Sequence, residues 1–143
     1  MPGFFNTKEK EEIVQAITEA EKLTSGEIRV HVEAKAGQDP RARAEQVFYK
    51  LGMDQTVDRN GVLFYLAVKD RRFVILGDEG IDRKTPADFW EKIKEEMAAE
   101  FVEGRFVSGV TKGIALAGQA LAQYFPYQKG DINELTDEIS GVD

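Results

Sequence analysis

The sequence contains no cysteine and a single histidine, His31. Without cysteine there are no disulfide bonds, thiolate metal sites or cysteine nucleophiles, and one histidine excludes a zinc site built from several imidazoles. No apolar run approaches the roughly 20 residues that span a bilayer; the longest candidate, residues 114–122, contains Gln119. No export signal is visible, because a charged run follows the first apolar residues. We therefore expect a cytoplasmic protein with no membrane partner.

Positive charge is in deficit. The 19 Lys and Arg residues stand against 26 Asp and Glu residues, which gives a formal net charge of −7 at pH 7. An acidic domain repels phosphate backbones, so we expect no nucleic-acid partner and regard cations as more natural ligands. Material for a core is plentiful: 42% of the 143 residues are hydrophobic and 10% are aromatic, which suits one compact domain.

Hydrophobic periodicity and turn signals predict helices over residues 7–23, 40–51, 86–101 and 106–125 and strands over residues 28–34, 62–68 and 73–76. The unbroken apolar run at 62–68 is typical of an interior strand, whereas the alternation at 28–34 predicts one apolar and one polar face. The first two strands should be parallel and the last two antiparallel. We expect an α/β fold, a three-layer α/β/α sandwich with a small mixed sheet and helices on both faces, over residues 1–126, and a polar tail over 127–143.

This topology gathers polar, glycine-bearing segments at one edge of the sheet. Residues 25–27, 58–61 and 78–82 all lie at strand ends on that edge, whereas Asp70 lies in the hairpin turn at the opposite end. Carboxylate and amide oxygens suit a hard cation such as Ca²⁺ or Mg²⁺. The alternative is that the glycines and Asn60 serve turns, and that Asp78 caps or solvates a loop.

Several short motifs resemble the TPM-domain family: SGEIRV at residues 25–30, RNGVL at 59–63, RRFVILGDEGI at 71–81 and FVEG at 101–104. This family includes thylakoid-lumen acid phosphatase-like proteins and photosystem II repair proteins, and the C-terminal residues look like its stand-alone bacterial branch. The resemblance implies an α/β/α sandwich and a phosphatase with a divalent cation near the strand ends. It carries Glu27, Asn60 and Asp78 over as site residues, with Asp82 as a further ligand. The chain departs from the best-known members because it shows no targeting peptide or transmembrane anchor.

Two functions remain open. In the first, the chain is a cation-stabilised interaction or accessory module that binds a protein partner and performs no chemistry. In the second, it is a metal-dependent phosphatase for phosphate monoesters, in which Asp78, Asp82 and Glu27 hold the cation and a metal-activated water attacks. There Asn60 would orient the substrate and Arg59 would meet the phosphate oxygens. We favour the binding module, because the sequence offers ligands without an evident base or nucleophile.

Overall fold

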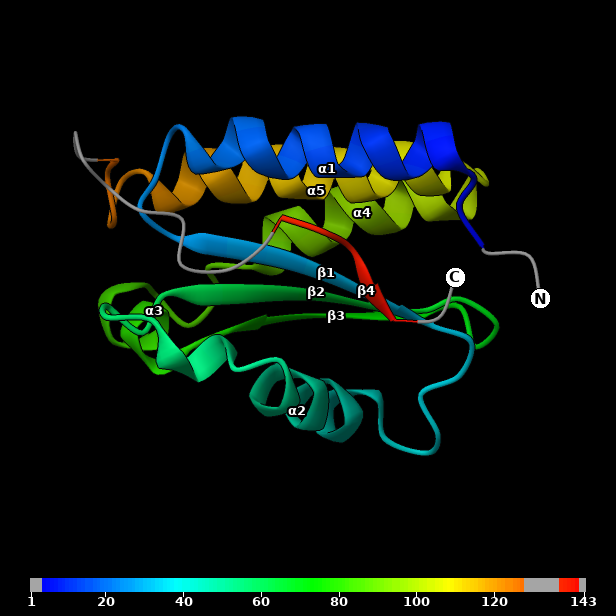
Figure 1. The fold of residues 1–143 in the computed structure, drawn as a ribbon, viewed down its shortest axis with the longest axis horizontal. Coiled ribbons are helices and arrows are strands. Elements are labelled where there is room, and N and C mark those ends of the chain that lie inside the picture. The colour runs from blue at the N-terminus through cyan, green and yellow to red at the C-terminus, as the bar shows by residue number, and fades with distance from the viewer. Residues whose placement is uncertain (1–3, 128–136, 142–143) are drawn as a thin grey trace.

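The computed structural model describes residues 4–127 and 137–141. The elements are α1 (Thr7–Glu21), β1 (Glu27–Glu33), α2 (Pro40–Lys50), the 3₁₀ turn η1 (Met53–Gln55), β2 (Gly61–Ala67), β3 (Arg72–Gly77), α3 (Glu79–Lys84), α4 (Glu91–Val102), α5 (Phe106–Leu121) and β4 (Ser140–Gly141). Helices α1, α4 and α5 lie on one side of the sheet and α2 on the other (Figure 1). The expected α/β/α sandwich is confirmed.

The sheet has the strand order β3-β2-β1-β4 and is mixed. Strand β1 runs parallel to β2 and to β4, and β2 runs antiparallel to β3. Every residue of β2 is buried, so its interior position, expected from the apolar run, is confirmed. Strand β4 was not expected; it places Ser140 and Gly141 beside His31 and Val32 at the edge of the sheet.

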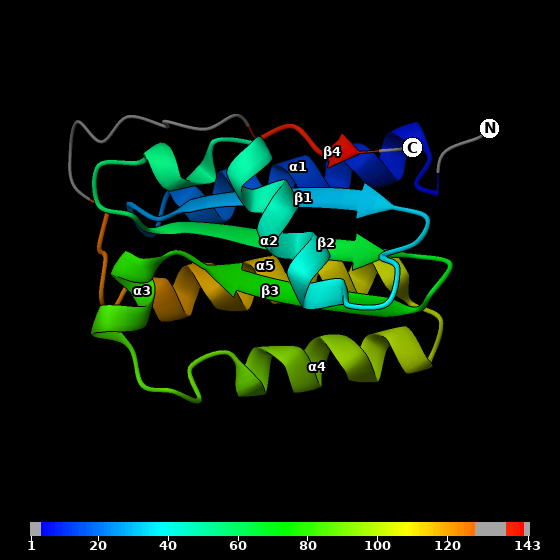
Figure 2. The same cartoon turned by 90° about the horizontal axis from the view of Figure 1, so that it is seen from below.

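Two helix starts follow the capping chemistry of the sequence. Asn6 caps α1 and accepts from the main-chain N–H of Glu9, while the Glu9 carboxylate accepts from the main-chain N–H of Asn6. Asp39 caps α2, and Pro40 occupies its first position, where a missing N–H costs nothing. Figure 2 shows α2 lying across the sheet.

The predicted helix over residues 86–101 is wrong at its start. Helix α4 begins at Glu91, and residues 86–90 form turns in which the ring centroids of Phe89 and Trp90 lie 4.7 Å apart. Thr85, the residue before the predicted helix, ends the short helix α3 and donates its hydroxyl to the Ile81 carbonyl at 2.8 Å. Six residues are too few to show hydrophobic periodicity, which explains why α3 was missed.

Polar residues on β1 are more buried than an alternating strand suggests. Glu27 is 3% exposed and His31 is 9% exposed. They share the α2 side of the sheet, since the alternating residues Ile28, Val30 and Val32 belong to the core beneath α1, α4 and α5. Both faces of β1 are therefore covered.

The largest core lies between the sheet and the helices α1, α4 and α5. Close approach between helices depends on two glycines of α5. A Cβ atom added to Gly118 would lie 2.8 Å from Cβ and 3.0 Å from Cα of Ala20 in α1, and one added to Gly113 would lie 2.4 Å from Sδ of Met97 in α4. Within residues 4–127 and 137–141, no helix is long and apolar enough to cross a membrane.

Candidate functional site

The starts of β1 and β2 and the end of β3 meet at one edge of the sheet. The main-chain N–H of Glu27 donates to the Asn60 carbonyl at 3.2 Å, and that of Asp78 donates to the Gly61 carbonyl at 2.9 Å. The convergence expected from the topology is therefore present. We call the segments 25–27, 58–61 and 78–82 the strand-end cluster.

Gly80 holds the start of α3 against the segment before β2. Its N–H donates to the Arg59 carbonyl at 2.9 Å. A Cβ atom at this position would lie 2.2 Å from the Asp58 carbonyl oxygen and 2.6 Å from that of Arg59. Only glycine permits this approach of two main chains, and the contact fixes where Asp78 and Glu79 stand relative to Arg59.

Arg59 is the centre of the strand-end cluster. Its Nε and Nη2 atoms donate to the two carboxylate oxygens of Asp78 at 2.8 and 3.0 Å, and its Nη1 donates to Glu79 Oε1 at 3.1 Å. The hydrogen bonds that Arg59 donates to Asp78, with the nearby charges of Asp78, Glu79 and Asp54, raise the pKa of the Arg59 guanidinium. Arg59 has a left-handed main chain, with φ at 49°. A buried carboxylate, 4% exposed at its side chain, is thus paired with an arginine that is 35% exposed.

Asn60 connects the segments of the cluster. It is 1% exposed, its side-chain amide donates to Ser25 Oγ at 3.4 Å, and its main-chain N–H donates to Thr56 Oγ1 at 3.2 Å. With its carbonyl accepting from Glu27, Asn60 contacts two separate parts of the chain, the segment 25–27 and the end of η1 at Thr56.

Glu27 and Asp82 are the other two carboxylates of the expected metal site. Glu27 is close enough to Glu21 of α1 to affect its ionisation: burial, Asp137 and Glu27 together raise the pKa of Glu21 to about 10. Asp82 is exposed on the first turn of α3. In the part of the chain that the structure describes, no three Asp, Glu or His side chains are grouped so that they could hold a metal ion.

Sequence reasoning missed a second polar group, at the far end of β1. Glu33 accepts from the Nε and Nη2 atoms of Arg43 in α2 and from the Tyr65 hydroxyl at 2.5 Å. These hydrogen bonds lower the pKa of Glu33 to about 2, and those from Arg43 have the largest effect. Burial and the hydrogen bond to Glu33 raise the pKa of Tyr65. The alternation of polar residues along β1 was the available signal, but it was interpreted as a polar face.

His31 extends this group to the C-terminal strand. Its Nδ1 lies 2.9 Å from Ser140 Oγ and its Nε2 lies 3.2 Å from Glu33 Oε1. Burial lowers the pKa of His31, although Glu33 opposes the shift. The hydrogen bond between the His31 ring and Ser140 attaches β4 to β1, which makes this group a structural connection.

Replacing Glu33 with glutamine is expected to lower the free energy of unfolding at pH 7 by about 2 kcal/mol. The fall in the Glu33 pKa from 4.5 to about 2 on folding sets the upper limit of this stability loss. The partial exposure of Arg43 makes the expected loss smaller than that limit. Because the folded-state pKa is depressed, this stability is present above pH 4.5 and is lost as the pH falls towards 2. Urea denaturation at pH 7, 4.5 and 3 measures both effects.

Glu45→Gln is the control. Among residues 4–127 and 137–141, Glu45 pairs only with the exposed Arg41, at 3.8 Å, so this substitution should cost less than about 0.5 kcal/mol. If wild type and Glu33→Gln lose stability equally between pH 4.5 and 3, the Arg43–Glu33 pair does not contribute as described.

Comparisons with known proteins agree with this architecture. The family model of the TPM domain matches residues 1–120. Among solved structures, the chain is similar to the NMR structure of the BA42 protein from the psychrophilic bacterium Bizionia argentinensis, with 47% sequence identity, a TM-score of 0.94 and coverage of 99% of this chain and 97% of that chain. None of the curated proteins matches. The family model spans most of the sequence, and the chain therefore belongs to the TPM-domain family.

Proposed function

We propose that the chain is a binding module that takes a divalent cation, Ca²⁺ or Mg²⁺, at Asp78 and Glu79 and performs no chemistry of its own. The observation that supports this is the convergence of both carboxylates on one positive group, Arg59. Two carboxylates held this way stabilise positive charge at a defined place, whether an arginine or a metal ion supplies it.

The donor set fits a hard cation in chemistry but needs two rearrangements. Asp78 and Glu79 offer only oxygen ligands. Asp82, in the first turn of the helix that Asp78 caps, is not grouped with them in the structure and would have to turn toward them to become the proposed third carboxylate. The Arg59 guanidinium now uses the oxygens that a cation would take, and its partial exposure gives it room to move out. Glu27 contributes negative charge from the start of β1.

Displacement of Arg59 explains how such a module would communicate with a partner. Once a cation neutralises Asp78 and Glu79, the Arg59 guanidinium becomes available to an acidic segment of a partner protein. Binding of the cation would thus alter the surface of the strand-end cluster without a change of fold.

The test is the effect of Ca²⁺ and Mg²⁺ on thermal unfolding. At a cation concentration about 100 times Kd, linkage adds about 2.7 kcal/mol, which raises Tm by roughly 5–10 °C for a domain of this size. Asp78→Asn should lose most of this shift. Glu11→Gln, which removes the same charge from an exposed position on α1, should keep it, and equal losses would indicate diffuse charge screening. Asp70→Asn is a poorer control, because Asp70 accepts from the Ala36 N–H at 2.8 Å.

Arg59→Gln separates this site from any other cation site. Removal of the competing guanidinium should tighten cation binding in calorimetric titration, because Asp78 and Glu79 then have no internal cation. Unchanged affinity in Arg59→Gln, or no heat from wild type at millimolar Ca²⁺ and Mg²⁺, would contradict the proposal.

A metal-dependent phosphatase is the alternative. It requires Arg59 for phosphate oxygens, yet the described contacts of its Nε, Nη1 and Nη2 atoms are with carboxylates. Turnover of a phosphate monoester with Mg²⁺ or Ca²⁺ that is lost in Asp78→Asn would replace the binding module by the phosphatase. Turnover that survives in Asp78→Asn would reveal a contaminating enzyme.

A further inference from the structure

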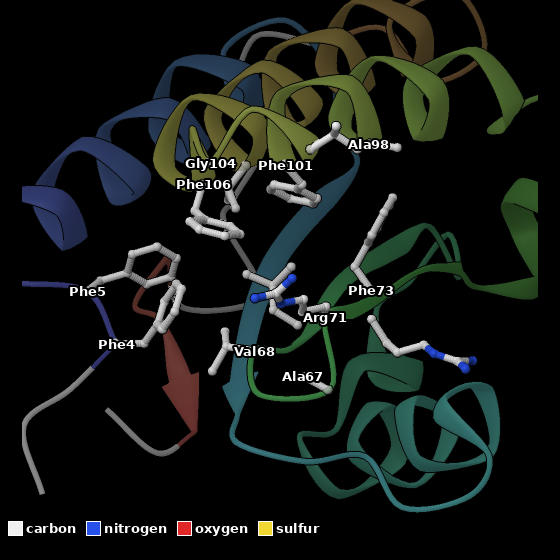
Figure 3. A pocket seen from close by; sticks show the side chains of 14 residues that line it. Phe4, Phe5, Ala67, Val68, Arg71, Phe73, Ala98, Phe101, Gly104 and Phe106 are labelled. Atoms are coloured by element: carbon white, nitrogen blue, oxygen red, sulfur yellow. The ribbon is translucent and has the colours of Figure 1, made fainter.

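A cavity of about 650 Å³ opens at the end of the sheet opposite the strand-end cluster. Its walls come from the N-terminal segment, the end of β2, the β2–β3 turn, α4 and the start of α5 (Figure 3). The volume lies within the range of about 300–1,000 Å³ that is typical of small-molecule sites. The cavity is separate from the residues of the proposed cation site.

Five phenylalanine rings form a continuous wall of this cavity. Phe4 contacts both Phe5 and Phe106, with ring centroids 4.9 and 5.5 Å apart. Phe101 contacts Phe106 and Phe73, at 5.9 and 5.2 Å. Phe4, Phe106 and Val102 are also among the large hydrophobic side chains that remain exposed, at 39, 40 and 85%. Exposed apolar side chains gathered around a hollow indicate a binding surface more strongly than the same residues scattered singly.

The charged side chains at this apolar wall are arginines. Of the ionisable residues among the described residues, only Arg71 and Arg72 line the cavity. Within residues 4–127 and 137–141, neither side chain has a hydrogen bond or an ion pair. Figure 3 shows the Arg71 side chain between Val68 and the rings of Phe101 and Phe106. Arg72 shares the α2 side of β3 with Val74 and Leu76, whereas Phe73 faces the cavity. In a chain of net charge −7, an Arg71 guanidinium without a carboxylate partner makes a local site for a negative group.

We propose that this cavity binds a small amphiphile with an anionic headgroup, of which a straight-chain carboxylate is the simplest form. The hydrocarbon chain lies against the phenyl rings, and the carboxylate meets Arg71 at the mouth. The guanidinium fork matches a planar carboxylate. A neutral apolar ligand would leave Arg71 unused, and an inorganic anion would leave the aromatic wall uncovered.

Calorimetric titration with octanoate, decanoate and dodecanoate, each below its micellar concentration, tests the apolar part. Each added pair of methylenes should strengthen binding about fifteenfold, the factor for about 0.8 kcal/mol per buried methylene. Decanol, which lacks the negative charge, should bind about fivefold more weakly than decanoate, the factor for about 1 kcal/mol of exposed ion pairing.

Two pairs of variants locate the site. Arg71→Gln should weaken decanoate to the level of decanol, while Lys69→Gln, which removes the same charge from the same turn but outside the cavity, should not. Ala98→Trp should weaken binding more than about tenfold by filling the cavity. Ala99→Trp, at the neighbouring exposed position of α4 that does not line the cavity, should leave binding unchanged.

Amide NMR shifts give a readout that depends on no variant. Decanoate should shift the signals of Val68, Phe101 and Gly104 and leave those of Asp78 and Gly80 in place. Three results would overturn the proposal: no binding of dodecanoate, equal affinity for decanoate and decanol, or shifts outside the cavity. Self-association of the wild type that Ala98→Trp abolishes would show instead that this face joins two copies of the chain. A failure of cation binding at Asp78 would leave the proposal unaffected.

Discussion

Replacing Gly80 with alanine is expected to lower the free energy of unfolding by roughly 3 kcal/mol. The added methyl carbon would lie 2.2 and 2.6 Å from two carbonyl oxygens, and neither can move without the main chain of residues 58–59. The gain of about 1 kcal/mol from removing a helical glycine is smaller than this overpacking cost. Urea denaturation measures the loss, and amide exchange should show α3 opening first.

Gly37→Ala is the matched control for Gly80→Ala. Gly37 has φ at 83° and nothing within 4 Å of an added Cβ atom. Alanine there should lower the free energy of unfolding by about 1–2 kcal/mol, only because it must adopt a left-handed main-chain conformation. If Gly80→Ala lowers the free energy of unfolding no more than Gly37→Ala does, the segment before β2 moves easily to make room for the methyl group. In that case, the contact at Gly80 does not hold Arg59 in place.

Replacing Gly118 with leucine is expected to cost about 3 kcal/mol or more, and replacing Gly113 about 1–3 kcal/mol. The difference lies in what must move. At Gly118 the main chain of Ala20 is 3.0 Å from an added Cβ atom, so α1 and α5 must separate, whereas at Gly113 the obstacle is the flexible Met97 side chain. Thermal and urea unfolding measure both losses.

The same substitution on the exposed side of α5, Ala115→Leu, should change stability by less than about 0.5 kcal/mol. Equal losses at Gly113 and Gly118 would mean that both contacts relax in the same way. A Gly113→Leu variant that melts with the wild type would remove the packing role assigned to that glycine.

Local chemistry was enough to predict most of the fold. The apolar run at 62–68 predicted the interior strand, and periodicity with turn signals predicted that α2 begins at residue 40, because each depends on a few neighbouring residues. Helix α3 was missed because Asp78 can cap a helix or solvate a loop, and the choice depends on contact between Gly80 and the segment before β2.

The candidate site was predictable only at the level of the main chain. Strand order brings Arg59, Asn60 and Asp78 to one edge, and that much follows from topology. The pairing of Arg59 with Asp78 depends on the left-handed main chain at Arg59 and on side-chain rotamers. The His31–Ser140 contact joins residues 109 positions apart, and no local pattern marks such a partner.

The packing of α1 against α5 has a consequence for how the chain folds. The first helix finds its partner at residues 106–121, so its apolar face stays uncovered until nearly the whole chain has left the ribosome. Contacts between distant parts of a chain pay a large loop-closure cost before they add stability, which slows folding. We expect chains that stop before α5 to remain unfolded and to aggregate. We also expect refolding of the full chain to be limited by the step that brings α1 and α5 together.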